Sequence, residues 1–190
     1  MSSKTHTVME AELNGKTIWN EAGKAGIALG GTVIGCSLLS SGLGHLGGGT
    51  MVTFLVSVIN FLVWLAKLVG CIWIMRYFMQ KLVRDYPEAD NHHTYVLGVE
   101  SAILSALIVA AFTMATVMFV SPESYQEAFE TAMAQTSAIL DSNSRAMIEG
   151  MMQNLPIIMF VSNLVYCFIY GWILSAILSR NIPSSNPFER

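Results

Sequence analysis

The residues best placed for chemistry are Lys67 and Glu100, because each interrupts a long apolar stretch. An ionisable side chain inside a membrane is costly unless it is paired or reaches the interface, so such a group is a functional hypothesis by default. Lys67 precedes Met75 by eight residues, and Glu100 follows Tyr95 by five. If Met75 and Tyr95 mark the same boundary, the two side chains lie roughly 12 Å and 8 Å from it. We therefore expect Lys67 and Glu100 to form an ion pair, with Lys24 as a competing partner for Glu100.

Two interpretations of this pair are open. The pair pins two helices together, with the lysine extending toward the interface, or it belongs to a proton- or ion-linked site. Transporter sites usually lie near the bilayer midplane, and the expected depth is shallower. The structural interpretation is therefore favoured.

Other polar side chains give weaker signals. Asn163, in the middle of the last apolar stretch, is expected to hydrogen-bond to another helix. The alternative interpretation is a small polar pocket that Asn163 forms with its neighbours Tyr166, Tyr170 and Trp172. His92 and His93 are expected to be solvated, because zinc sites need three or four ligands.

No catalytic or metal-binding motif is evident in the sequence. The 3 cysteines all lie in apolar stretches, where small buried residues are the norm. There is no phosphate-binding loop, no Gly-x-Ser-x-Gly elbow and no His-Glu-x-x-His motif. The sequence thus predicts no enzyme, no metal site and no cofactor.

These few polar side chains are set in an unusually apolar chain. Of its 190 residues, 53% are apolar and 12% are charged, whereas soluble domains are typically about a quarter charged. The mean hydropathy is +0.53, and a net charge of −3 gives no sign of nucleic-acid binding. The composition predicts an integral membrane protein surrounded by the lipid bilayer and excludes an ordinary soluble enzyme.

Four apolar stretches reach the roughly 20 residues that a helix needs to cross the bilayer core. They cover residues 22–43, 51–75, 95–120 and 155–178. In lipid only helices and closed barrels satisfy their backbone polar groups, and four strands do not close a barrel. The sequence therefore predicts an all-α polytopic membrane protein with four transmembrane helices. The membrane domain covers residues 22–180, between a segment at 1–21 and a tail at 181–190.

The basic residues predict the orientation, because lysine and arginine accumulate on the cytoplasmic side. With four crossings, the basic residues on one side are Lys4, Lys16, Lys24, Arg76, Lys81, Arg84, Arg180 and Arg190. The other side has only Arg145. We therefore predict that both termini are cytoplasmic and that the loop at residues 121–154 is extracytoplasmic.

That outer loop contains a predicted amphipathic helix. Ser121-Pro122-Glu123 is typical of a helix start. The apolar face of this helix comprises Tyr125, Phe129, Met133 and Leu140. Acidic residues outnumber basic ones in the loop, so anionic headgroups would repel it. The helix is either a linker lying over the outer face of the bundle or a docking surface for an extracytoplasmic partner.

Small residues predict where helices approach one another closely. They are Gly26, Gly30, Gly31 and Gly35 in the first span, and Gly98, Ala102 and Ala106 in the third. A chain with four spans has internal partners for such faces. We therefore expect packing within the chain rather than homodimerisation.

The layout resembles a known family of small bacterial four-span proteins, catalogued as domain of unknown function 4199. The resemblance rests on three features: a basic residue and a short charged loop after the second span, here Arg76-Tyr77-Phe78-Met79-Gln80-Lys81, a third span rich in small residues, and the acidic outer insertion. Gly98 takes the place of a glycine expected in such proteins, whereas the loop with His92 and His93 departs from the family pattern. The resemblance implies a bacterial inner-membrane location and no reaction.

Two functions are consistent with the sequence. The first is a non-enzymatic accessory protein that packs with envelope partners, supported by the small-residue faces and the outer amphipathic helix. The second is a small oligomeric transporter or channel with Lys67 and Glu100 near its pathway. Four helices enclose little space, so the second requires self-association.

Overall fold

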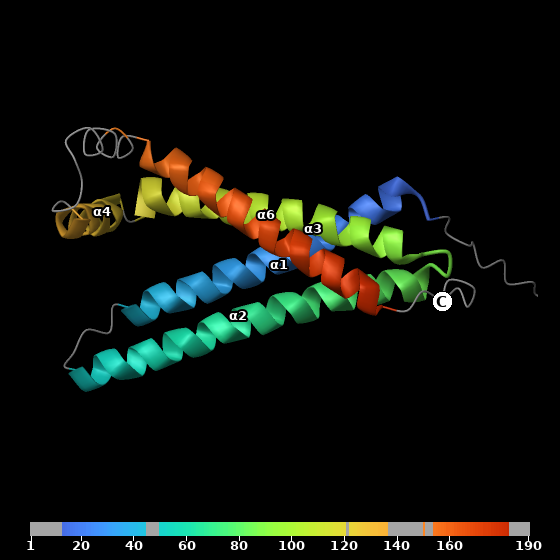
Figure 1. Cartoon of the computed structure of the whole chain (residues 1–190), viewed down its shortest axis with the longest axis horizontal. Coiled ribbons are helices and arrows are strands. Elements are labelled where there is room, and N and C mark those ends of the chain that lie inside the picture. Colours follow the sequence, from blue (N-terminus) through green and yellow to red (C-terminus); the bar gives the residue numbers. More distant parts are fainter. Residues whose placement is uncertain (1–12, 45–49, 121, 137–149, 151–153, 183–190) are drawn as a thin grey trace, which may run out of the picture.

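The computed structural model describes residues 13–44, 50–120, 122–136, 150 and 154–182. Within these residues the secondary structure is helical and contains no strand. The helices are α1 (Gly15–Gly44), α2 (Thr50–Asp85), α3 (Asn91–Ala115), the π-helical turn η1 (Thr116–Val120), α4 (Pro122–Thr136) and α6 (Leu155–Asn181) (Figure 1).

Four of the described helices are long and apolar enough to cross a membrane. They cover Gly15–Leu43, Phe54–Asp85, Asn91–Val120 and Leu155–Asn181. The predicted all-α polytopic membrane fold with four transmembrane helices is therefore confirmed.

The helix ends differ from the predicted span ends. α2 does not stop at Met75 but continues to Asp85, because the apolar positions Met75, Met79 and Leu82 keep helical spacing and lysine and arginine are good helix formers. The 36 residues of α2 extend roughly 54 Å, against a bilayer core of about 30 Å. The predicted loop after the second span is therefore mostly helix.

α3 begins earlier than predicted, at Asn91, because Asp90 caps it. The backbone N–H of His93 donates to Oδ1 of Asp90 at 2.8 Å, and the His93 ring Nδ1 lies 2.6 Å from the same oxygen. His93 is thus part of a helix cap rather than a solvated side chain. Burial raises the pKa of Asp90, but the hydrogen bonds from the His93 backbone and ring, together with the charges of His93 and His92, outweigh burial and hold the pKa of Asp90 below its ordinary value.

The four spans form an arc rather than a closed square. α3 packs extensively against α6 and α1, and α1 packs against α2, whereas α2 touches α3 and α6 sparsely. Figure 1 shows that α1 and α2 run together and separate from α3 and α6 toward the end where α4 lies. We call that end the open end. The opposite end, where α1 begins and α2 ends, is the closed end.

The hydrophobic core gathers at the closed end. Its buried residues there include Ile18, Met75, Met79, Leu82, Leu97, Leu174 and Leu178. Gly98 of α3 allows this tight packing, because a methyl group at its Cα would meet Met79 of α2 and lie 2.6 Å from Ser175 Oγ of α6. Three spans therefore converge where residue 98 has no side chain.

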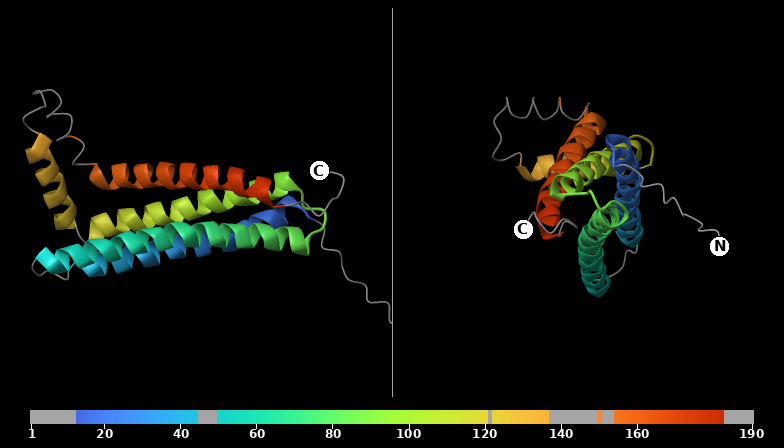
Figure 2. Two further views of the ribbon diagram at one scale, coloured as in Figure 1. Left: turned by 60° about the horizontal axis from the view of Figure 1, so that its bottom comes forward. Right: turned by 90° about the vertical axis from the view of Figure 1, so that its right-hand side faces the viewer.

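α4 lies at the open end and runs across the direction of the spans (Figure 2). Among the described residues its packing is chiefly with the adjoining η1. The predicted amphipathic helix is thus present over Pro122–Thr136, but it does not pack along the spans. Leu140, the last predicted residue of its apolar face, lies outside the described residues.

Candidate functional site

A cavity of about 120 Å³ lies between all four spans, on the open-end side of the core. Met75 and Leu174 line the cavity and also belong to the core, so the core forms its floor. The polar groups in the lining are Lys67, Cys71, Ser105, Tyr166, Cys167 and Tyr170. The remaining lining is mostly apolar, and the cavity exists because α2 and α6 stay apart above the floor.

A second cavity, of about 240 Å³, lies between α1 and α2. Cys36, Ser37 and Ser40 of α1 line it together with Trp64 and Lys67 of α2. Trp64 and Lys67 therefore border both cavities. Within the part of the chain that the structure describes, Lys67 is the one formally charged group in either lining.

The predicted ion pair between Lys67 and Glu100 is wrong. The described ion pairs join Lys24 and Lys81 to Glu21, Arg84 to Asp85, and His93 to Asp90. Lys67 has no carboxylate within ion-pairing distance among the described residues. One carboxylate oxygen of Glu100, Oε2, is buried and has no hydrogen-bond partner among the described residues.

The relative depth of the two residues along their helices explains why the ion pair does not form. Gly98 packs against Met79, so Glu100 lies level with about Tyr77 on the antiparallel α2. Lys67 is ten residues from Tyr77, which corresponds to roughly 15 Å along the helix. The prediction placed the end of the second helix too early and the start of the third too late, because α2 runs past Met75 and α3 begins before Tyr95.

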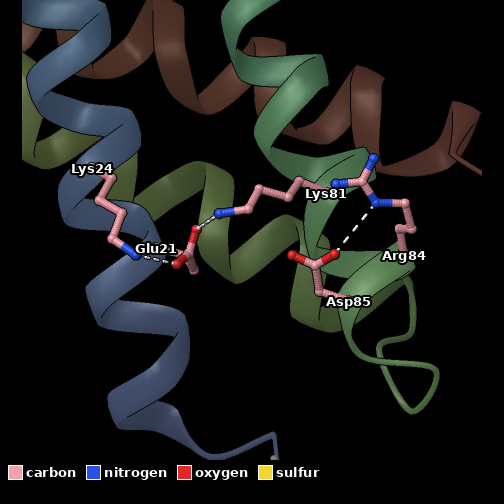
Figure 3. A network of polar contacts seen from close by, with 5 residues as sticks. All are labelled: Glu21, Lys24, Lys81, Arg84 and Asp85. Carbon is pink, nitrogen blue, oxygen red and sulfur yellow. Dashed lines mark hydrogen bonds and ion pairs between the residues drawn. The ribbon is translucent and has the colours of Figure 1, made fainter.

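Lys24 belongs to a different network, at the closed end. Its Nζ donates to Oε1 of Glu21 at 2.5 Å, and Nζ of Lys81 donates to Oε2 of the same carboxylate at 2.8 Å. Figure 3 shows Glu21 between the two lysines, with the pair Arg84–Asp85 beside them on α2. Glu21 thus ties α1 to α2. The spacing of three residues between Glu21 and Lys24 is a signal for a helical ion pair, whereas Lys81 is brought in only by tertiary packing.

The small residues of α1 divide into two faces. A methyl group at Gly26 would lie 2.8 Å from Leu104 Cβ, and one at Gly30 would lie 3.0 Å from Ile108. Positions four apart share a helix face, and this face turns toward α3. Gly31 and Gly35 point elsewhere, and no neighbouring side chain lies within 4 Å of an added methyl group.

The contacts of α3 with α6 involve a glycine that the sequence analysis missed. A methyl group at Gly171 would lie 2.5 Å from Ala102 Cβ, and Ala106 is also buried. Gly171 and Ser175 are spaced by four residues, which is the pattern of small residues used to identify the other faces. That pattern was present in the last span and would have found them.

Two asparagines have surroundings that the sequence did not predict. Asn163 donates to the Met159 carbonyl of its own helix at 2.9 Å, so the expected bond to another helix is not formed, since an asparagine side chain reaches the carbonyl one turn back. Asn60 was not singled out, yet its Oδ1 is buried without a hydrogen-bond partner. It precedes Lys67 by seven residues, or two turns on the same face.

No family model, curated protein or solved structure matches the chain. The resemblance to the four-span family catalogued as domain of unknown function 4199 therefore stays a prediction. The function has to rest on the chain's own geometry and charge.

Proposed function

We propose that the chain is a non-enzymatic accessory protein of a bacterial inner membrane, which packs with another membrane protein or helps to assemble it. Helix α4 carries this proposal. Its stripe of Tyr125, Phe129 and Met133 is spaced by four residues. Among the described residues the helix packs chiefly on η1, at the end of the third span, rather than along α1, α2, α3 or α6. Such a stripe on a helix is a common recognition element.

The charge of α4 indicates the chemistry of the partner. Glu123, Glu127 and Glu130 are exposed on it, and the helix contains no lysine or arginine. Anionic lipid headgroups repel such a helix, which argues against a role as a membrane-surface anchor. A protein groove with an apolar floor and basic residues at its rim complements both the stripe and the acids.

The distribution of basic residues indicates the side of the membrane from which the partner approaches. Arg76, Lys81 and Arg84 all lie in the part of α2 nearest the closed end. Because basic residues accumulate on the cytoplasmic side, the proposed closed end is cytoplasmic and α4 is extracytoplasmic. The partner then reaches the protein from outside the bilayer core.

Site-specific photo-crosslinking tests this proposal. A benzophenone amino acid replaces Phe129 in the stripe or, as the matched control, Thr131, which is exposed and lies about 200° away around the helix. In cells of the source organism, position 129 is expected to give one adduct of defined mass and position 131 none. Equal adduct formation at both positions, or none at position 129 in folded protein, would overturn the docking role of α4.

A second candidate is the small oligomeric transporter or channel, and the position of Lys67 between two cavities favours it. Against it, the packed core closes the floor below Lys67, and Glu100 lies at another depth. The mass of the detergent-solubilised complex separates the two candidates. A homo-oligomer without any partner supports the transporter, whereas a heteromeric complex supports the accessory protein.

A further inference from the structure

Lys67 is a cation inside the bilayer span without a counter-ion among the described residues. The next charged residue toward the closed end is Arg76, nine residues away and roughly 14 Å along the helix. That distance exceeds the reach of a lysine side chain, so Lys67 does not extend to the interface there. An uncompensated ammonium at this depth is costly, and an anion that enters the cavity lowers that cost.

The lining of the cavities shows which anion fits. The phenols of Tyr166 and Tyr170 and the hydroxyl of Ser105 share the first cavity with Lys67, and the hydroxyl of Ser40 shares the second. Hydroxyl groups and an ammonium all donate hydrogen bonds, and among the described residues neither lining includes a carboxylate. This set of donors suits a head group that carries negative charge and accepts hydrogen bonds.

The surroundings of these donors suit a hydrocarbon chain. Leu29, Val33, Leu68 and Val109 line the rest of the first cavity. Tyr166 is 71% exposed and Trp64 is 49% exposed, so the cavity opens sideways between α2 and α6, toward the lipid. A ligand can thus enter from the bilayer and leave part of its chain there.

We propose that the Lys67 cavities bind a single-chain amphiphile with a carboxylate head group, such as a long-chain fatty acid, with the carboxylate on the Lys67 ammonium. The two cavities, of about 120 and 240 Å³, hold the head group and the first methylenes. This site is separate from α4 and goes beyond the accessory role.

Two other anions fit less well. The phosphodiester of a bilayer phospholipid stays ionised at neutral pH and is held at the interface, whereas a fatty acid can enter the span in its neutral, protonated form and so reach the depth of Lys67. A second copy of the chain does not supply the charge either. Copies related by an axis along the membrane normal keep each residue at its own depth, and the one acidic residue within the predicted spans, Glu100, is roughly 15 Å away in depth.

Trp64 provides a reporter for the test, because it borders both cavities. Bromine quenches tryptophan fluorescence at short range. The full-length protein in nanodiscs is titrated with dibromostearic acid, with dibromostearyl alcohol of the same chain, and with a dibrominated phosphatidylcholine. The acid is expected to quench in a saturable way, and the alcohol to bind at least tenfold more weakly. The phospholipid is expected to show no saturable component.

Four variants make the test specific. Lys67→Met is expected to abolish the saturable quenching and Lys67→Arg to keep it. Lys16→Met, which removes an exposed charge at the closed end, is expected to leave it unchanged. Trp64→Phe is expected to remove the saturable component of the quenching, which assigns that component to Trp64. Circular dichroism and size-exclusion profiles establish that each variant is folded.

The proposal is overturned by equal affinity for the acid and the alcohol, or by unchanged quenching in folded Lys67→Met. It is also overturned if native mass spectrometry finds a polypeptide bound in a Lys67-dependent manner, because the counter-ion is then a partner's carboxylate. None of these outcomes depends on α4. Failure here therefore leaves the crosslinking test of the accessory role unaffected.

Discussion

Replacing Gly98 by alanine should destabilise the bundle more than any other single methyl addition to α3. The added methyl group would meet Met79 of α2 and lie 2.6 Å from Oγ and 2.8 Å from Cβ of Ser175 on α6. Met79 is 0% exposed, and Ser175 Oγ donates to the Gly171 carbonyl at 2.7 Å, so neither neighbour has free space. Overpacking of this kind typically costs about 1–3 kcal/mol. We expect a value near the upper limit, because two helices have to move.

Gly31→Ala is the matched control. The same chemical change occurs there in a helix interior with no neighbouring side chain within 4 Å of the new methyl group. Removing a glycine from a helix interior stabilises by about 0.5–1 kcal/mol. The two variants should therefore differ by roughly 3 kcal/mol in the free energy of unfolding.

The difference is measurable by titrating the purified protein with SDS in mixed micelles and following helix content by circular dichroism. Gly98→Ala should unfold at a clearly lower SDS mole fraction than the wild type, and Gly31→Ala at an equal or higher one. If Gly98→Ala proved as stable as Gly31→Ala, the convergence of α2, α3 and α6 at residue 98 would be refuted.

Three further predictions concern stability. Gly171→Ala should destabilise through its contact with Ala102, and Ala102→Gly in the same chain should restore most of the loss; SDS titration of both variants and the double variant measures this coupling. Glu21→Gln weakens both ion pairs of Figure 3 and should cost about 1 kcal/mol in low salt, whereas Asp85→Asn, in an exposed pair, should change little. Because the pKa of Asp90 is lowered in the folded protein, the ionised carboxylate stabilises the fold. This stabilisation is present above the pKa of Asp90 in the unfolded state and is lost as pH falls through its pKa in the folded state. Asp90→Ala should lower the melting temperature at pH 7 and flatten its acid dependence, and an unchanged acid limb would contradict the capping role.

The sequence was most informative about the features that contact with lipid or water determines. Residues that must face lipid are apolar over the length of a membrane, so four spans could be placed without tertiary information. The face with Gly26 and Gly30 could also be found from spacing alone. The helix ends could not be placed as well, because Arg76 and Lys81 are polar without breaking a helix.

The ion pair shows most clearly what spacing misses. Lys67 and Glu100 were assigned similar depths because both lie in apolar stretches near an expected boundary. Their real depths depend on how far α2 and α3 continue beyond the bilayer, and no local pattern records that continuation. The contact of Gly98 with Met79 fixes the relative position of the two helices.

The sequence by itself determined that this chain is a membrane protein of four helices, because the transfer of side chains between water and lipid is a property of each residue and its near neighbours. Only the tertiary structure decided which helices touch. It placed Lys67 between two cavities, brought Lys81 to Glu21, and set α4 across the direction of the spans. These features depend on the relative depth and rotation of whole helices, which are fixed by the fit of small residues against distant partners rather than by hydropathy.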